Sequence, residues 1–391
     1  MAYEGFFGEA VDRIGGEPIS ARMARKAPIR HLDPSLLLVT LLLSAYGAVM
    51  VNSTGAGNAA GGLEASNLLK RQLAYLVAGV FVLLAVSFFD YRHLGGLSPL
   101  VYGATLISLI LVLSPLGDTQ KGATRWINLG AFQAQPSELA KVAVIITIAA
   151  YLAQRKGEVR ARDVALCLGL VAAPSILIYL QPDLGTMMVF VALLGALLLV
   201  GGARIRHFVT LGILGLIAIV VVLQAGMLKD YQVQRLTSFL DPNPDVQSLG
   251  YNLTQSKIAI GSGGMRGKGL GGRNTQTSLD FVPEQHTDFI FTAVGEQLGF
   301  VGSATLLGLF AFLIWRGLRI AVMSRDLFGA MLAAGIVALW AFQLFVNVGM
   351  TMGIMPITGI PLPFISFGGS SLITNYVAVG LLLNIHMRRF L

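Results

Sequence analysis

The sequence predicts an all-α integral membrane protein with about ten transmembrane helices. Hydrophobic residues make up 55% of its 391 residues and charged residues only 12%. The mean hydropathy of +0.72 is far above that of soluble globular domains. Apolar runs of about 17 to 25 residues recur from Leu36 onward, and a helix of that length crosses the hydrocarbon core with every backbone group bonded internally. Residues 34–391 therefore form one polytopic domain, after a polar tail of residues 1–33.

The apolar runs place the ten spans at 35–52, 72–89, 97–116, 137–154, 163–180, 185–202, 207–226, 288–314, 327–349 and 370–387. Most basic residues fall on one side of these spans, at Arg22, Arg25, Lys26, Arg30, Arg92, Arg155, Lys156, Arg160, Arg162, Arg204, Arg206, Arg316, Arg319, Arg325, Arg388 and Arg389. The short loops on the other side carry only Lys70, Arg71, Lys121 and Arg125. Cytoplasmic loops are the basic ones, so we expect both termini in the cytoplasm.

Composition also excludes some classes of protein. The net charge of +8 does not indicate nucleic-acid binding, because the basic residues follow the pattern of membrane orientation. Cys167 is the single cysteine, which leaves no intrachain disulfide and no multi-cysteine metal site. The N-terminal tail lacks the apolar stretch of a secretory signal.

One connection is much longer than the others, at about 60 residues from 228 to 287, and lies outside under this topology. Long ordered loops are usually functional. Its glycine-rich stretch, 261–269, could be a flexible linker. It could also bind an anion through exposed backbone NH groups and the side chains of Arg266 and Lys268. It is not a Walker loop, because the GxxxxGK[ST] spacing is absent.

Two ionisable residues lie three apart at the outer start of the fourth span, Glu138 and Lys141. A charge at membrane depth is costly, so the pair is expected to face the bundle interior and to bind a polar group there. Glu138 could instead be a first-turn glutamate that the helix dipole favours, after Pro136. Lys141 gains nothing from that dipole, which favours the interior pair.

Asp288 ends the long loop, directly before the aromatic residues that begin the eighth span. It could cap that helix. It could equally act as a general base at the membrane surface, with Glu284 and His286 nearby. Asp183, before the sixth span, is expected to be a helix cap. The apolar segment 356–371 is rich in helix breakers, so we expect it to be buried in the mouth of the bundle.

Four stretches together resemble the SEDS family of lipid-linked peptidoglycan polymerases. They are 283–291, Arg125-Trp126-Ile127, 135–141 and 359–371, and the resemblance extends over nearly all of 34–389. The sequence of residues 359–364 is more similar to the rod-shape-determining RodA type than to its division relative FtsW.

The resemblance implies a glycosyltransferase that polymerises lipid II in the bacterial cytoplasmic membrane, for cell elongation and shape. The partners it implies are lipid II, a class B penicillin-binding protein that crosslinks the glycan, other elongation-complex membrane proteins and membrane lipid. By the same resemblance Asp288 corresponds to the essential loop aspartate. Glu138 and Lys141 correspond to polar residues of the central cavity, and Arg125 and Trp126 to a motif in an outer loop.

We hypothesise that Asp288 accepts the proton of the acceptor sugar's 4-hydroxyl while undecaprenyl diphosphate leaves and the anomeric carbon inverts. Arg125, Lys141, Arg266 and Lys268 are candidates for binding the diphosphate, and His286 and Thr287 for contacting substrate. A divalent cation, Mg²⁺ or Mn²⁺, could assist, and no organic cofactor is expected. Two alternatives stay open: a flippase for lipid II, and a non-enzymatic scaffold for the penicillin-binding protein.

Overall fold

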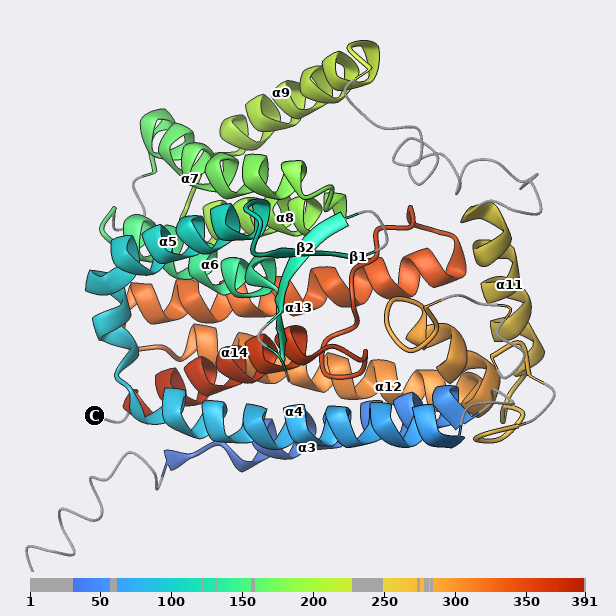
Figure 1. Cartoon of the computed structure of the whole chain (residues 1–391). Helices are drawn as coiled ribbons and strands as arrows, with labels where there is room; N and C mark the ends of the chain where they lie inside the picture. Colours follow the sequence, from blue (N-terminus) through green and yellow to red (C-terminus); the bar gives the residue numbers. More distant parts are fainter. Residues whose placement is uncertain are drawn as a thin grey trace, which may run out of the picture.

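A computed structural model describes residues 31–56, 62–120, 123–128, 130, 132–155, 159–226, 249–272, 275–277, 281 and 284–389. All ten predicted spans are helices in it (Figure 1): α3 (Pro34–Ala56), α4 (Gly62–Phe88), α5 (Tyr91–Leu113), α6 (Pro136–Ala153), α7 (Ala161–Leu180), α8 (Leu184–Val200), α9 (Ile205–Gln224), α12 (Ile290–Val322), α13 (Leu327–Met352) and α14 (Gly369–Arg388). Nine are long and apolar enough to cross a membrane, and the tenth, α8, is an apolar helix of 17 residues. The predicted fold class is confirmed.

Three predicted boundaries differ clearly from the structure. The second span was expected from residue 72, but α4 begins at Gly62, so Lys70 and Arg71 lie in a helix rather than in a loop. The third span was expected from residue 97, but α5 begins at Tyr91 because the Asp90 side chain accepts a hydrogen bond from the Arg92 backbone NH and caps the helix. The eighth span was expected to end at 314, but α12 continues to Val322. Arg316 and Arg319 therefore lie on the last turns of a helix rather than in a loop.

The outer end carries structure that the hydropathy did not predict. A three-stranded antiparallel sheet, β1 (Gly117–Gln120), β2 (Ala123–Asn128) and β3 (Gln133–Ala134), connects α5 to α6. The long loop contains a further helix, α11 (Leu249–Ser262), which packs against α12 and α13. Its residues 227–248 lie outside the described part of the chain.

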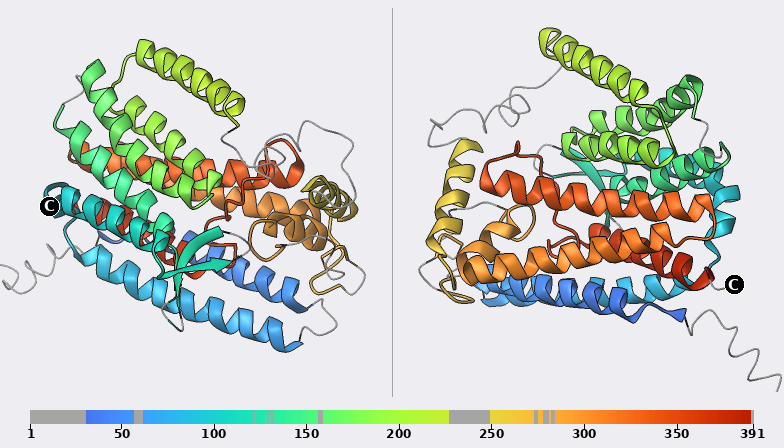
Figure 2. Two further views of the ribbon diagram at one scale, coloured as in Figure 1. Left: turned by 45° about the horizontal axis from the view of Figure 1, so that its top comes forward. Right: turned by 180° about the vertical axis from the view of Figure 1, so that it is seen from behind.

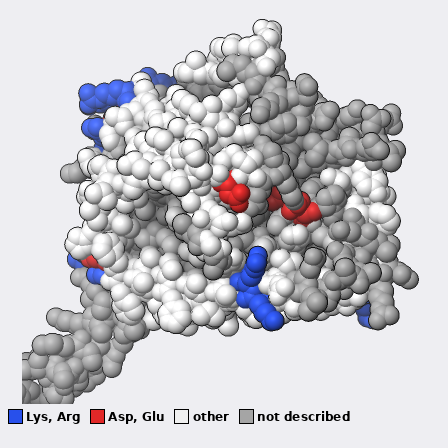
Figure 3. Space-filling view, viewed as in Figure 1, with Lys and Arg blue, Asp and Glu red and all other residues white. Residues whose placement is uncertain are grey.

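Helix α6 is the most enclosed of the early helices, with 15 of its 18 residues buried. It packs against α5, α8 and α13, while α14 packs most closely on α4. At that second contact Gly79 makes room for a ring, because a Cβ there would lie 2.5 Å from Cδ2 of Tyr376. Helix α9 stands at the edge of the bundle, with most of its side chains exposed (Figures 1 and 2). The face in Figure 3 is largely uncharged, as expected for a surface in contact with lipid.

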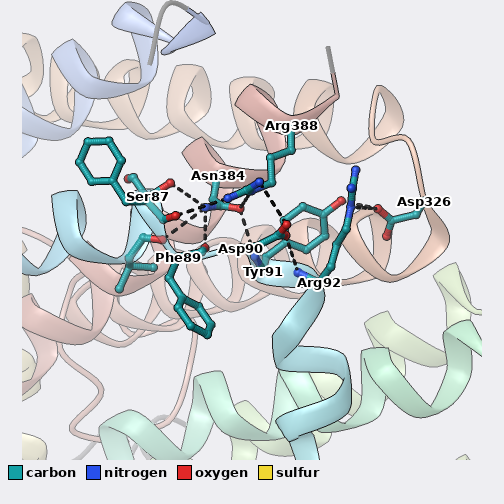
Figure 4. A network of polar contacts seen from close by, with 10 residues as sticks. Ser87, Phe89, Asp90, Tyr91, Arg92, Asp326, Asn384 and Arg388 are labelled. Atoms are coloured by element: carbon teal, nitrogen blue, oxygen red, sulfur yellow. Dashed lines mark hydrogen bonds and ion pairs between the residues drawn. The ribbon is translucent and has the colours of Figure 1, made fainter. Parts of the chain in front are cut away.

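A polar network joins three helices at the end where α3 begins and α14 finishes (Figures 1 and 4). The fully buried Asn384 of α14 donates from Nδ2 to the carbonyl oxygens of Ser87 and Phe89, both at 2.6 Å. Its Oδ1 accepts from the backbone NH of Tyr91 at 3.2 Å and from Nε of Arg388 at 3.1 Å. These bonds satisfy the backbone of the tight turn between α4 and α5.

An ion pair and a hydrogen bond extend this network. Arg388 pairs with Asp90 at 3.1 Å (Nη1 to Oδ2). The Tyr91 hydroxyl donates to Asp326, whose other oxygen caps α13 by accepting from the Gly329 backbone NH at 2.7 Å. The cytoplasmic ends of α5, α13 and α14 are thus linked through side chains.

We expect Asn384→Ala to destabilise the fold by about 2–4 kcal/mol, because it leaves several buried backbone groups without partners. Thermal unfolding of the purified protein in detergent measures this as a lowered Tm. Thr210→Ala, which removes an exposed hydroxyl on α9 that bonds only to its own helix, is the matched control. Equal Tm values for the two variants would contradict the assigned role of Asn384.

Candidate active site

Asp288 lies in a hydrogen-bonded turn directly before α12. The backbone NH groups of Thr287 and Phe289 both donate to the carbonyl of Glu284, at 3.1 and 3.2 Å. Glu284 itself has a φ of +55°, a left-handed conformation that non-glycine residues rarely adopt outside functional sites. Helix α12 begins after Phe289, whose side chain makes no capping bond. Phe289, not Asp288, therefore occupies the N-cap position of α12.

Three successive carbonyl groups of this turn accept hydrogen bonds from α13 and from the segment that precedes α14. The backbone NH of Phe367 donates to the carbonyl of His286 at 2.8 Å, and Oγ of Ser366 donates to that of Thr287 at 2.6 Å. Nδ2 of Asn347, on α13, donates to the carbonyl of Asp288 at 2.9 Å. These three bonds hold the turn through its backbone carbonyl groups.

The segment 356–368 that provides two of these bonds is irregular and mostly buried, as its helix breakers predict. Asn347 also donates to its Ile360 carbonyl at 2.8 Å and so joins it to Asp288. Phe364 has a φ of +64° and is held between the rings of Trp340 and Tyr376, with centroids 5.7 and 6.0 Å away. Packing thus stabilises a strained backbone next to the loop aspartate.

Glu138 and Lys141 form the predicted pair inside the bundle. Nζ of Lys141 lies 2.5 Å from Oε1 of Glu138, and the two residues are only 2% and 3% exposed. A first-turn glutamate that is stabilised only by the helix dipole would not have to be buried beside a lysine. The pair carries no net charge, so Lys141 already has a counter-ion.

The glycine-rich stretch is not a flexible linker, because its backbone is bonded to α12. The backbone NH groups of Lys268 and Gly269 donate to the carbonyls of Glu296 and Gln297, at 3.0 and 2.9 Å. In return the NH groups of Phe300 and Val301 donate to the carbonyls of Gly264 and Met265, at 2.8 and 3.1 Å. This seam, between residues 263–269 and 296–301, replaces the helical bonds that α12 loses at its kink.

The kink itself is at Gly299, which has a φ of +65° and a ψ of −158°. A Cβ at this position would lie 2.4 Å from the backbone N of Gly267, and one at Gly263 would lie 2.0 Å from the Gly295 carbonyl oxygen. The glycines therefore allow the backbone of residues 263–269 to lie directly against that of α12. This close contact explains why so many glycines occur here better than phosphate binding does.

Glu296 is the residue that organises the outer loop. It is fully buried on α12, and its carboxylate accepts from Nζ of Lys268 at 2.8 Å. It also accepts from the backbone NH groups of Gln276 and Thr277, at 2.7 and 2.9 Å, and from the Thr277 hydroxyl. Four donors to one buried carboxylate make a satisfied network that ties Lys268, Gln276 and Thr277 to the helix that follows Asp288.

We expect Glu296→Gln to loosen this loop, because the new amide presents NH₂ to backbone donors and loses the ion pair with Lys268. Hydrogen exchange at Gln276 and Thr277 should accelerate at least tenfold, measured by mass spectrometry in detergent. Thr254→Ala, an exposed position on α11, is the control. Wild-type protection in the Glu296→Gln variant would contradict the assigned role.

The remaining predicted residues are distributed over the outer end. Arg125, on β2, donates from Nε to the Gln181 carbonyl at 3.1 Å and from its Nη2 to the Pro182 carbonyl. Trp126 is half-buried opposite Asp118 in the sheet. His286 stacks edge-on against Phe367 at 6.0 Å between centroids. Arg266 is exposed in the turn after α11.

Asp183 is the predicted cap. Its Oδ1 accepts from the backbone NH of Thr186 at the start of α8, at 3.2 Å. Glu296, Gln343 and Asn347 were not predicted as site residues. The cost of a charge at membrane depth, which identified Glu138, also applies to Glu296, so that criterion could have found it. Buried amides such as Gln343 and Asn347 give a weaker signal in a sequence.

The family model for cell cycle proteins of the FtsW, RodA and SpoVE type matches residues 34–390, almost all of the described domain. This chain belongs to that family. SEDS proteins are thus its relatives, as the motifs predicted. Together with the ten apolar helices, this makes the chain a multi-pass protein of the bacterial cytoplasmic membrane.

Two SEDS relatives illustrate the breadth of the match. The peptidoglycan glycosyltransferase MrdB of Escherichia coli K12 is 38% identical over 360 residues, which are 92% of this chain and 94% of MrdB. Stage V sporulation protein E of Bacillus subtilis 168 is 40% identical over 363 residues, which are 91% of this chain and 98% of that protein.

Solved structures of the family have the same fold. RodA of Thermus thermophilus superposes with a TM-score of 0.68 at 30% identity and covers 92% of this chain and 98% of RodA. A chain of a peptidoglycan synthase complex, described as coordinating polymerization and crosslinking, superposes with a TM-score of 0.77 at 33% identity and covers 92% and 98%.

Proposed function

We propose that this SEDS protein is a peptidoglycan glycosyltransferase that polymerises lipid II and releases undecaprenyl diphosphate. One observation carries the proposal: the carboxylate of Asp288 stands at the outer end of the bundle on a turn whose own backbone is fixed by Asn347, Ser366 and Phe367. A turn held in this way fixes the backbone from which the base acts.

In the proposed reaction Asp288 accepts the proton of the acceptor sugar's 4-hydroxyl. The oxygen attacks the donor's anomeric carbon, the bond to the diphosphate breaks, and both of its electrons leave with the diphosphate. A single displacement of this kind inverts the carbon, so an α-linked diphosphate becomes a β-glycosidic bond. The turn residues His286 and Thr287 are candidates for orienting the acceptor sugar.

The four basic candidates for binding the diphosphate differ in the partners that they already have. Lys141 and Lys268 each pair with a buried glutamate, and Arg125 bonds to two carbonyls. Arg266 is exposed beside the seam. We therefore assign it, ahead of the other three, to the departing charge.

A divalent cation remains part of the proposal. Among the described residues no group of three or more His, Cys, Asp or Glu stands together, so the donor set fits Mg²⁺ or Mn²⁺ only as an ion that shares substrate oxygens. Asp288 would hold it, with the diphosphate as the larger part of its shell. When bound, the cation would neutralise charge on the leaving group.

The proposed cellular role is elongation, with a class B penicillin-binding protein as partner. The likeness to RodA and to a synthase complex that combines polymerization with crosslinking supports this pairing. We also propose other elongation-complex membrane proteins and membrane lipid as partners.

Polymerisation in detergent tests the activity and separates it from lipid II transport. A flippase needs two sides of a membrane, whereas a polymerase should make long glycan from labelled lipid II in micelles. We expect glycan ladders on a gel from the purified wild-type chain. Transport across vesicles without any glycan in micelles would favour the flippase and reject the proposal.

A further inference from the structure

Among the buried side-chain polar atoms without hydrogen-bond partners in the described part of the chain, four lie on α6, α13 and α14 toward the outer end. Both amide atoms of Gln343 on α13, Oγ1 of Thr374 on α14 and Oγ of Ser137 on α6 are in this state. Their residues are 1%, 2% and 1% exposed. Buried polar groups in native proteins are almost always satisfied, so such a set indicates a place where another polar group binds.

Helical geometry directs Gln343 toward the junction of three helices. Gly335 of α13 faces α6, since a Cβ there would lie 2.5 Å from Cγ2 of Ile145. Trp340 of α13 faces α14, because its Nε1 donates to Oδ1 of Asn375 at 2.8 Å. Successive residues are about 100° apart around the α13 axis, so Trp340 points about 140° away from Gly335. Gln343 points about 80° away from Gly335, which is a direction between α6 and α14.

The other groups point to the same junction. Glu138 lies two turns before Ile145, so the Glu138–Lys141 pair is on the α13 face of α6. Ser370 of α14 contacts the start of α6, because its Oγ donates to the Gln133 carbonyl and accepts from the Gln135 NH. Thr374 follows one turn deeper on that face.

Depth along the bundle agrees as well. Gln343 is about 4.5 Å outward from Trp340 and Thr374 about 1.5 Å outward from Asn375, so the two differ by about 3 Å in depth. Asn347, which holds the Asp288 carbonyl, is one further turn outward from Gln343, about 6 Å. A sugar whose hydroxyl is at Asp288 would therefore place its other substituents near Gln343.

The charge of this junction decides the kind of ligand. Glu138 and Lys141 neutralise each other at 2.5 Å, and the groups around them are amides and hydroxyls. A diphosphate would lose its hydration here without gaining a net positive partner. A neutral carboxamide suits Gln343 best, because each amide offers the donor and the acceptor that the other needs.

We infer that Gln343, with Thr374 and the Glu138–Lys141 pair, forms a subsite for the uncharged acetamido sugar of the lipid-linked substrate, and that Gln343 determines its specificity. The inference rests on the proposed function for the identity of the lipid. It assigns the sugar to this junction and leaves the diphosphate to Arg266 and to the cation that Asp288 would hold.

Equilibrium binding of two fluorescent lipids to the purified full chain in detergent tests this subsite. The lipids are lipid II and undecaprenyl diphosphate, which lacks the sugar. Gln343→Met keeps the side-chain length and removes both polar atoms. We expect it to weaken lipid II binding about tenfold and to leave undecaprenyl diphosphate binding unchanged. Thr147→Val, at a buried α6 hydroxyl that bonds to its own helix, should change neither.

A second variant covers the case in which Gln343→Met does not fold. Gln343→Glu keeps the shape and should shift preference about tenfold toward a lipid II analogue with free amines in place of acetamido groups. Equal losses for both lipids, or no loss for either, would overturn the inference. These outcomes differ from failure of the proposed function, in which the wild-type chain binds lipid II but makes no glycan.

Discussion

Replacing Asp288 by Asn should abolish glycan synthesis while leaving the fold intact. General-base catalysis contributes about 10²–10⁴-fold, and an amide cannot accept the hydroxyl proton. Asn347 holds the turn through the backbone carbonyl of Asp288, and the isosteric Asn keeps that bond, so the variant should keep its Tm. The measurement is glycan yield from lipid II in micelles, with Tm measured on the same sample.

Asp118→Asn is the matched control, since it neutralises another outer carboxylate, on β1, outside the catalytic turn. It should polymerise like wild type. Wild-type yield from Asp288→Asn would remove Asp288 from the mechanism. Loss of activity with a collapsed Tm would assign the residue a structural role instead.

Breaking the Glu138–Lys141 pair should have the second large effect, this time on stability. Lys141→Met leaves a buried carboxylate without its counter-ion, which costs about 3–5 kcal/mol. The double variant Glu138→Gln with Lys141→Met removes both charges and should recover most of that loss. Thermal unfolding of the three proteins measures the difference.

The same set of variants distinguishes an enzyme from a scaffold. If the pair binds the substrate sugar as proposed, the double variant of a glycosyltransferase should be stable yet inactive. A scaffold has no use for these charges. Growth and cell shape maintained by the double variant, with the native copy deleted, would favour the scaffold and reject the enzymatic role of the pair.

The sequence predicted those features that depend on local pattern. Ten apolar runs correspond to ten helices, and the three-residue spacing of Glu138 and Lys141 on one helix was enough to predict their contact. Asp183 was predicted as a cap from its place before an apolar run, and the structure places it there. Each of these depends on neighbours within about one or two helical turns.

Features that depend on distant partners were not predictable in this way. Glu296 is explained only by residues about 20 to 30 positions earlier in the chain, which the seam brings beside it. The sequence of the glycine-rich stretch suggested a linker or an anion site. The spacing of its residues does not reveal that it packs against the kink of α12 at Gly299. The short outer sheet gives no hydropathy signal.

The network around Asn384 has a mechanical consequence. It holds the inner ends of α4, α5, α13 and α14 together, so a tilt of α14 would take this network as its pivot and would act on the Ser370 bonds at the outer end. Helix α14 has 20 residues and is about 30 Å long. A tilt of about 4° about that pivot would displace its outer end by about 2 Å, comparable to the spacing that decides whether a proton can be transferred. Small rotations at the cytoplasmic side are therefore amplified where the reaction is proposed to occur.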